Sequence, residues 1–232
     1  MLSLVDLVQA GTLSLDMAAE MAHVAAGGGS FLTAAGPGGV GKTTLMGALL
    51  AFLSPGTEIV TIEGPETLER LPAPSPEAPK CLVVHEIGSG HWYGYLWGPA
   101  VGRYVEAAGS PGRSLASNLH AETYQEAVGQ LAGLDVSAEA LGAVACLAFM
   151  AAPRGKRRVT TVWYADGSGG HACAWRWRPD DDSFERGAEA PSLASADDLG
   201  RYREFLRQAH ADRVVRMETL RGRALTELFR EG

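Results

Sequence analysis

The chain has 232 residues, enough for one large domain with a core that needs no covalent cross-links. Its formal net charge of -7 argues against a general nucleic-acid-binding surface, because such a surface needs a basic field. Its three cysteines form no C-x-x-C pair, and its longest apolar run, residues 141–152, is too short to span a bilayer. We therefore expect a reduced, cytoplasmic protein without a disulfide framework or a zinc site.

Two short helices are expected ahead of the first strand. Residues 2–10, LSLVDLVQA, form the first helix. Residues 14–26, SLDMAAEMAHVAA, form the second, and Ser14 is placed to cap its first turn. Glycines at 27–29 end that helix, so residues 1–29 make an N-terminal helical segment.

A glycine-rich loop follows the expected strand at residues 30–35. Its sequence, GPGGVGKTTLM over residues 36–46, fits the pattern G-x-x-x-x-G-K-[ST], in which glycines let backbone N–H groups turn toward phosphate oxygens. The helix that starts at Lys42 directs its positive end at the same anion. The predicted nucleotide site consists of Gly36, Pro37, Gly38, Gly39, Val40, Gly41, Lys42, Thr43 and Thr44.

Each of the last three loop residues has an expected contact. Lys42 reaches the β- and γ-phosphates, Thr43 offers its hydroxyl to Mg²⁺, and Thr44 faces the α-phosphate. A guanine nucleotide is disfavoured, because its usual motif N-K-x-D needs an asparagine and the only one here, Asn118, lies outside such a motif.

Two further strands are expected to end on carboxylates. Residues 57–63 end at Glu63 and residues 81–86 end at Glu86. Because parallel strands bring their carboxyl ends to one edge of a sheet, both acids should lie beside the phosphate loop. We expect Glu86 to hold the metal ion through a water molecule and Glu63 to orient the attacking water. Glu66 is a possible substitute for Glu63 in that role.

The second half of the chain continues the alternation of helices and strands. His120 follows a strand within residues 114–122 and could contact the γ-phosphate or transmit its loss. An apolar helix is expected from Ser137, and the basic stretch 153–158, PRGKRR, is interpreted as a solvated turn before a strand. That strand and residues 171–178 should form a hairpin.

The remaining sequence divides the chain into a core and a tail. Residues 30–178 are the expected P-loop ATPase core, and residues 179–232 an acidic linker followed by helical sequence. Apolar residues between 197 and 229 recur at helical spacing and predict one or two amphipathic helices. The arginines of this tail are interpreted as part of a solvated face.

Several stretches, taken in chain order, resemble the sequence blocks of the type II/type IV secretion ATPase family, which includes the motors of pilus assembly and retraction. The P-loop block and the block around His120 are the most distinctive. The matching stretches are residues 12–50, EIVTIEGPETLE at 58–69, CLVVHEI at 81–87, GSPGRSLASNLHAETYQEAVGQL at 109–131 and RRVTTVWYADG at 157–167.

The resemblance implies an α/β fold with a RecA-like P-loop core, a mainly parallel sheet flanked by helices, a late β-hairpin and C-terminal helices. It implies that the loop binds ATP with Mg²⁺ and that Lys42 is catalytic. It also implies that Glu63 activates water, that Glu86 lies near the metal, and that His120 is the histidine of the block known in this family as the histidine box. It also implies a hexameric ring at the inner face of a membrane, coupled to a pilus or secretion platform protein. From the negative net charge we expect no direct binding of nucleic acid.

The chain lacks most of the arginines that the family has between two of these blocks. The family places arginines between the blocks that contain Glu63 and Glu86, and this chain has only Arg70 there. We therefore expect hydrolysis that is slow or depends on a partner, with Arg103 and Arg113 as substitutes, because an arginine finger is worth about 10³ to 10⁵ in rate.

Two other functions remain open at this stage. A small-molecule kinase would use the basic stretch 153–158 as a lid over its nucleotide. A regulatory or assembly protein would bind nucleotide at the same loop without turning it over.

Overall fold

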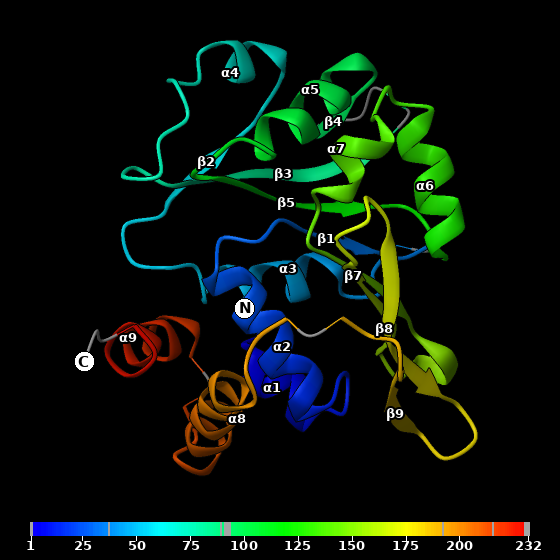
Figure 1. The fold of residues 1–232 in the computed structure, drawn as a ribbon. Helices are drawn as coiled ribbons and strands as arrows, with labels where there is room; N and C mark the ends of the chain where they lie inside the picture. The colour runs from blue at the N-terminus through cyan, green and yellow to red at the C-terminus, as the bar shows by residue number, and fades with distance from the viewer. Residues whose placement is uncertain are drawn as a thin grey trace.

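One mixed sheet runs through the whole protein (Figure 1). The computed structural model describes residues 2–36, 38–88, 90, 94–191, 193–214 and 216–229, and over these residues the strand order is β2-β3-β5-β1-β6-β7-β8-β9, with β4 paired to β3. The strands are β1 Phe31–Ala34, β2 Glu58–Thr61, β3 Lys80–Gly88, β4 Tyr95–Trp97, β5 Arg113–Leu119, β6 Cys146–Ala151, β7 Arg158–Ala165, β8 His171–Arg178 and β9 Ser183–Arg186.

Helices cover both faces of this sheet. α5, α6 and α7 share one core cluster with the strands, and in Figure 1 α5 and α7 lie above the parallel strands and α6 lies at their right. α1, α2, α3, α8 and α9 share the other cluster and lie below. The helices are α1 Leu4–Gln9, α2 Leu15–Ala26, α3 Lys42–Leu50, α4 Pro65–Glu69, α5 Pro99–Ala108, α6 Tyr124–Ala132, α7 Ala138–Gly142, α8 Ala196–Ala211 and α9 Met217–Glu227.

In the parallel part of the sheet, β1 is an inner strand. β1 pairs in parallel with β5 on one side and with β6 on the other, and β5 separates β1 from β3. Phe31 and Leu32 of β1 are almost fully buried, on opposite faces and in different core clusters. The predicted fold class, an α/β RecA-like core with a mainly parallel sheet flanked by helices, is confirmed.

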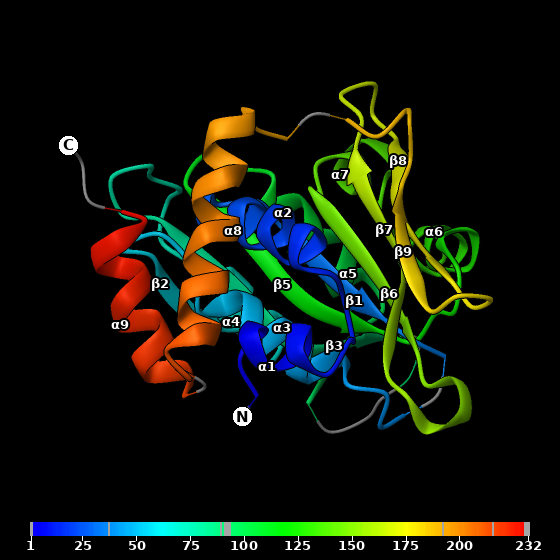
Figure 2. The same cartoon turned by 90° about the horizontal axis from the view of Figure 1, so that it is seen from below.

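The two N-terminal helices are present where the sequence predicts them. Ser14 caps α2 by accepting a hydrogen bond from the backbone N–H of Met17 at 3.1 Å. Met17 and Met21 of α2 are buried, and each such side chain contributes about 1.5–3 kcal/mol when fully removed from water. α8 runs alongside α2 (Figure 2), so this part of the C-terminal tail belongs to the core below the sheet.

The apolar helix expected from Ser137 is wrong over most of its length. The helix ends at Gly142, and residues 146–151 form β6, which is buried between β1 and β7. A short apolar run that is covered on both faces has no periodicity, so helix and strand cannot be separated by pattern alone. The strand after it and the hairpin of β7 and β8 are confirmed.

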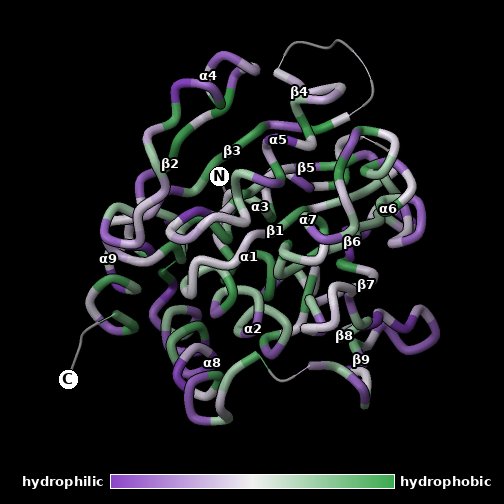
Figure 3. The backbone as a smooth tube through the Cα atoms, turned by 45° about the horizontal axis from the view of Figure 1, so that its top comes forward, coloured by the Kyte–Doolittle hydropathy of each residue, from purple (hydrophilic) through white to green (hydrophobic). Residues whose placement is uncertain are grey.

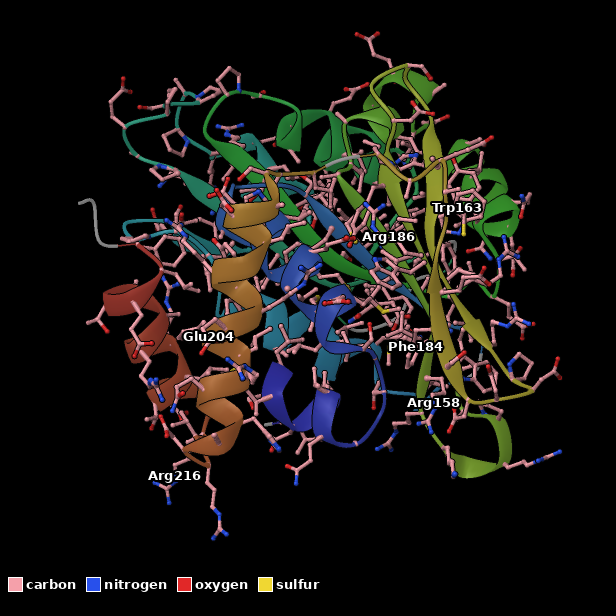
Figure 4. All side chains as sticks on the ribbon, turned by 60° about the horizontal axis from the view of Figure 1, so that its bottom comes forward. Arg158, Trp163, Phe184, Arg186, Glu204 and Arg216 are labelled. Carbon is pink, nitrogen blue, oxygen red and sulfur yellow. The ribbon has the colours of Figure 1, made fainter. Side chains whose placement is uncertain are left out.

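The sequence also missed three small elements: α4, β4 and β9. β9 falls in the stretch expected to be a linker, and Arg186 on it reaches toward α2 (Figure 4), where its Nε donates to Glu20 Oε1 at 2.8 Å. Trp175 of β8 donates to the other oxygen of Glu20 at 2.7 Å. A buried carboxylate with two such donors ties the late strands to α2.

Hydropathy follows these layers. Figure 3 shows hydrophobic residues concentrated in the inner strands and hydrophilic residues on the turn between β8 and β9. Over the described residues, the helices are all too short or too polar to cross a bilayer. The predicted C-terminal helices are present as α8 and α9, which bury Phe205, Leu206 and Leu220.

Candidate functional site

The phosphate loop lies between β1 and α3, as the sequence predicts. Gly39 and Gly41 have φ values of 76° and 114°, in the left-handed region that favours glycine. The helix begins at Lys42, with Gly41 as its N-cap and no side chain capping it, so its first N–H groups are available to an anion. Pro37 lies outside the described residues.

Three of the predicted side chains meet beside this loop. Lys42 Nζ lies 3.1 Å from Glu86 Oε1, and His120 Nε2 lies 3.1 Å from the same oxygen. His120 Nδ1 is 3.3 Å from Lys42 Nζ and 3.0 Å from the carbonyl oxygen of Gly36. Residues from β3, from the end of β5 and from α3 therefore form one cluster of a cation, an anion and an imidazole.

The carboxylate of this cluster is only partly satisfied. Glu86 is 6% exposed, and its Oε1 has the two ion-pair contacts but no directed hydrogen bond within the described residues. Its other oxygen, Oε2, accepts from the hydroxyl of Tyr95 at 3.0 Å. A buried oxygen of this kind can still accept a hydrogen bond from a bound water.

Tyr95, which was not among the residues predicted for the site, lies on β4 directly opposite Glu86. Its hydroxyl is also 3.3 Å from His120 Nε2. Burial first, and then the neighbouring Glu86 carboxylate, raise the pKa of the Tyr95 phenol, so it stays protonated and donates. β4 is too short to be recognised from sequence alone, and only its pairing with β3 brings Tyr95 to the site.

A bulge in β3 sets the direction of Glu86. β3 and β5 pair at Val84 with Ser117 and again at Ile87 with Leu119, so β3 has one residue more than β5 between these two points. Such bulges redirect side chains and are frequent next to functional sites. Glu86 is therefore inside the strand, two residues before its end, and not at its last position as expected.

Asn118 joins the strands to the loop and is fully buried. Its Oδ1 accepts from Thr33 Oγ1 at 2.6 Å, and its Nδ2 donates to the carbonyl oxygen of His85 at 2.5 Å and to Thr43 Oγ1 at 3.2 Å. A single carboxamide thereby connects β1, β3, β5 and α3. In the sequence, Asn118 was relevant only because it lies outside the motif for guanine recognition.

The structure does not bring Glu63 to this cluster. Glu63 is exposed and follows β2, the strand at the outer edge of the sheet, three strands from β1.

The cavity beside the phosphate loop, of about 400 Å³, is lined among the described residues by Gly38 to Thr44, His85, Glu86, Tyr95, His120 and Arg157.

Arg157 enters the same cavity from the turn between β6 and β7. Its side chain donates to the carbonyl oxygen of Gly39 at 3.4 Å, and its Cδ lies 3.4 Å from where a Cβ on Gly41 would be. The sequence interpretation of residues 153–158 as a solvated turn is correct for the exposed Arg154 to Arg157 but wrong for Arg158, which is buried and paired with Asp182. It also misses the contact of Arg157 with the loop. The sequence feature that could have indicated this contact is the cluster of arginines near a strand end.

The donor set fits Mg²⁺. Thr43 supplies an exposed hydroxyl, and Glu86 supplies a carboxylate oxygen without a directed hydrogen bond. Both are hard oxygen ligands, and Mg²⁺ is usually held by one or two protein oxygens together with substrate phosphates and waters. No cluster of three or more His, Cys, Asp or Glu side chains suited to a metal occurs in the described part of the chain, so a phosphate ligand would have to complete the coordination.

Comparisons with known proteins give distant likenesses among solved structures. No protein-family model and no curated protein matches the chain. Among solved structures, it is similar to the VirB11 ATPase of the Brucella suis type IV secretion system in complex with sulphate, with a TM-score of 0.49 and 18% identity over 69% of this chain. The match covers 56% of that ATPase. Function must therefore be argued from the site.

Proposed function

We propose that this chain is an ATP-binding P-loop ATPase of the secretion and pilus motor type. One observation supports this most directly: Lys42, Glu86 and His120 are far apart in sequence, yet their side-chain nitrogen and oxygen atoms lie within 3.3 Å of one another beside the glycine loop. A loop that only held a phosphate would need the lysine and the backbone, but not a buried carboxylate and an imidazole.

Each member of the cluster has a proposed role. Lys42 exchanges its contact with Glu86 for the β- and γ-phosphates when ATP binds, since both partners are anionic. Glu86, freed from that contact, accepts a hydrogen bond from a water near the metal. His120, which touches Gly36, Lys42 and Glu86, reports whether the γ-phosphate is present.

We also propose Mg²⁺ as the cofactor, with Thr43 and Glu86 as the residues that hold it, the latter through water. Bound there, it would neutralise charge on the phosphates as the γ-phosphate is transferred to water. The proposal that Glu63 activates water rests on the family resemblance alone, because Glu63 does not line the cavity beside the loop.

The proposed assembly is a homo-oligomeric ring, with six subunits by the family resemblance, that acts on a membrane-bound pilus or secretion platform. A neighbouring subunit could supply arginine to the γ-phosphate, which a finger does in trans in other P-loop enzymes. Among the expected substitutes, Arg113 donates to the carbonyl oxygen of Pro72 and so lies away from the loop, and Arg103 does not line its cavity.

The test is phosphate release from ATP by the purified chain with Mg²⁺, measured together with the mass of the assembly in the same buffer. Release that is lost in Lys42→Ala and in Glu86→Gln supports an ATPase, and parallel measurement of Glu63→Gln decides whether that residue takes part. ATP binding without phosphate release by any oligomer would contradict the proposal.

A nucleotide-binding protein that does not hydrolyse is the second candidate. The observation that favours it is the position of Glu63 outside the cavity, which leaves one carboxylate where hydrolysis commonly uses two. In that case Lys42→Ala would abolish ATP binding, and Glu86→Gln would change no catalytic rate.

A further inference from the structure

A separate cavity lies at the end of the sheet opposite to the phosphate loop. It has a volume of about 290 Å³, and its lining includes Lys80 and Arg113, which are the first residues of β3 and β5. Glu86 and His120 lie toward the other ends of these two parallel strands. In Figure 1 the segments that form the cavity, the connection from α3 to β2 and the stretch between α4 and β3, lie together at the left.

The walls of this cavity are stiff. Pro76 and Pro79 line it from the stretch between α4 and β3, and a proline ring fixes one backbone angle. This stretch packs directly on the start of β5, since Gly112 has a φ of 72° and a Cβ there would collide with the carbonyl oxygen of Ser75. A preformed site loses less conformational freedom when a ligand binds.

Arg113 brings a positive charge that no carboxylate neutralises within the described residues. One of its terminal nitrogens donates to the carbonyl oxygen of Pro72, while its Nε is buried and has no hydrogen-bond partner in the described part of the chain. Three other arginines that are at least partly buried, Arg158, Arg186 and Arg223, each form an ion pair with a carboxylate. A buried donor without a partner is unusual in a folded protein and is commonly satisfied by a bound water or ion.

The rest of the polar lining also favours an anion. Lys80 supplies a second positive charge, and its ion-pair partner Glu58 has a side chain that is 62% exposed, so this pair is weak and can be exchanged. Ser54 and Thr57 add two hydroxyls, which lie 2.8 Å from each other. Among the described lining residues there is no aspartate or glutamate. The end of α2 borders the cavity with a partial charge of only about -0.5, against two full positive charges.

We propose that this cavity binds a small oxyanion of the phosphate class, either inorganic phosphate or a compact phosphate ester. Arg113 and Lys80 hold its oxygens by charge-assisted hydrogen bonds, and the hydroxyls of Ser54 and Thr57 donate to it. A phosphate group carries about -1.5 to -2 charges at pH 7 and so matches two cations better than a carboxylate does. The inference does not depend on the ATPase proposal, because the glycine loop lies at the other end of the strands.

The test is a titration of the full chain with inorganic phosphate, with glycerol phosphate and with acetate at constant ionic strength, followed by backbone amide signals in NMR spectra. These signals report where a ligand binds. Shifts at Gly28 and Thr57, which line the cavity, are therefore distinguished from shifts in the glycine loop at residues 38–44.

Three variants accompany the unmodified chain. Arg113→Gln removes the charge that has no carboxylate partner, and Lys80→Gln removes the second charge while breaking only an exposed ion pair. Arg103→Gln changes an exposed arginine of α5 that does not line the cavity, and it serves as the matched control. The amide spectrum of each variant shows whether it is folded.

In the unmodified chain, at least one of the two phosphates should shift the cavity signals to saturation, and acetate should bind at least about tenfold more weakly. Arg113→Gln should weaken phosphate binding at least about tenfold and Lys80→Gln at least about threefold, because each loses a charge-assisted hydrogen bond, while Arg103→Gln should match the unmodified chain. Shifts confined to the glycine loop, or equal affinity in Arg113→Gln and the control, would overturn the inference and leave the ATPase proposal standing. If Arg113→Gln does not fold, unchanged affinity in Lys80→Gln overturns it.

Discussion

Lys42 and Glu86 form an ion pair of 3.1 Å that is almost completely removed from solvent. The lysine that we propose to bind phosphate is thus paired with a carboxylate of the same cluster. Burying either charge alone would be costly, and breaking such a pair by removing one partner typically costs about 3–5 kcal/mol. Phosphate can release Glu86 only by replacing it as the counter-ion of Lys42.

Glu86→Gln should separate binding from turnover. The substitution removes the anion that competes with phosphate for Lys42, so ATP should bind at least as tightly as before. Turnover should fall by about 100-fold or more, the usual size of a lost proton-transfer or water-orienting group. Nucleotide titration and phosphate release measure the two effects. Glu106→Gln, an exposed change on α5, is the matched control, and undiminished turnover in Glu86→Gln would refute the role of Glu86.

Tyr95→Phe should lower turnover about tenfold with little change in ATP affinity, because hydrogen bonds to charged groups are worth about 1.5–3 kcal/mol and this one acts on Glu86. Steady-state kinetics distinguish kcat from KM. Tyr124→Phe removes another hydroxyl, bonded to His171 at 3.2 Å, and should leave turnover unchanged. Equal kinetics for the two variants would show that Tyr95 does not position Glu86.

Arg157→Ala should reduce kcat/KM at least about tenfold, since the side chain lies at the loop and at the cavity that would hold phosphates, and arginine fingers contribute still more. Arg154→Ala changes an exposed arginine of the same turn that does not line the cavity beside the phosphate loop. Phosphate release over a range of ATP concentrations compares the two. Indistinguishable curves would remove Arg157 from the site.

Stability should fall as the pH drops below about 6.5, the ordinary pKa of histidine. Burial lowers the pKa of His171, which donates from Nε2 to the carbonyl oxygen of Val144 at 2.7 Å. The unfolded chain therefore takes up a proton before the folded chain does, and protonation favours unfolding by at most about 1.4 kcal/mol per pH unit. Between the lowered pKa and pH 6.5 this stability is lost progressively as the pH falls.

Urea unfolding at several pH values between about 5 and 8 measures this slope, since that interval spans the ordinary histidine pKa. His171→Gln keeps a donor for Val144 and removes the titrating group, so its free energy of unfolding should depend less on pH. The same slope in both proteins would show that His171 does not carry the effect.

Local sequence was enough to predict most of the helices and strands and the phosphate loop. Ser14 and the glycines after α2 mark the limits of that helix by capping chemistry and by backbone freedom, which depend on neighbours in the chain. It was not enough for β6, because a run buried on both faces carries no period, or for β4, which is three residues long.

The order of residues along the chain is enough to infer that a glycine-rich loop joins a strand to a helix, and that an acid and a histidine lie near the ends of later strands. Which side chains meet beside the loop depends on the folded arrangement of the strands. Strand order and the bulge in β3 bring Glu86 and Tyr95 to Lys42, while the edge position of β2 keeps Glu63 away. Pairing between distant strands sets these distances, and no spacing along the chain encodes them.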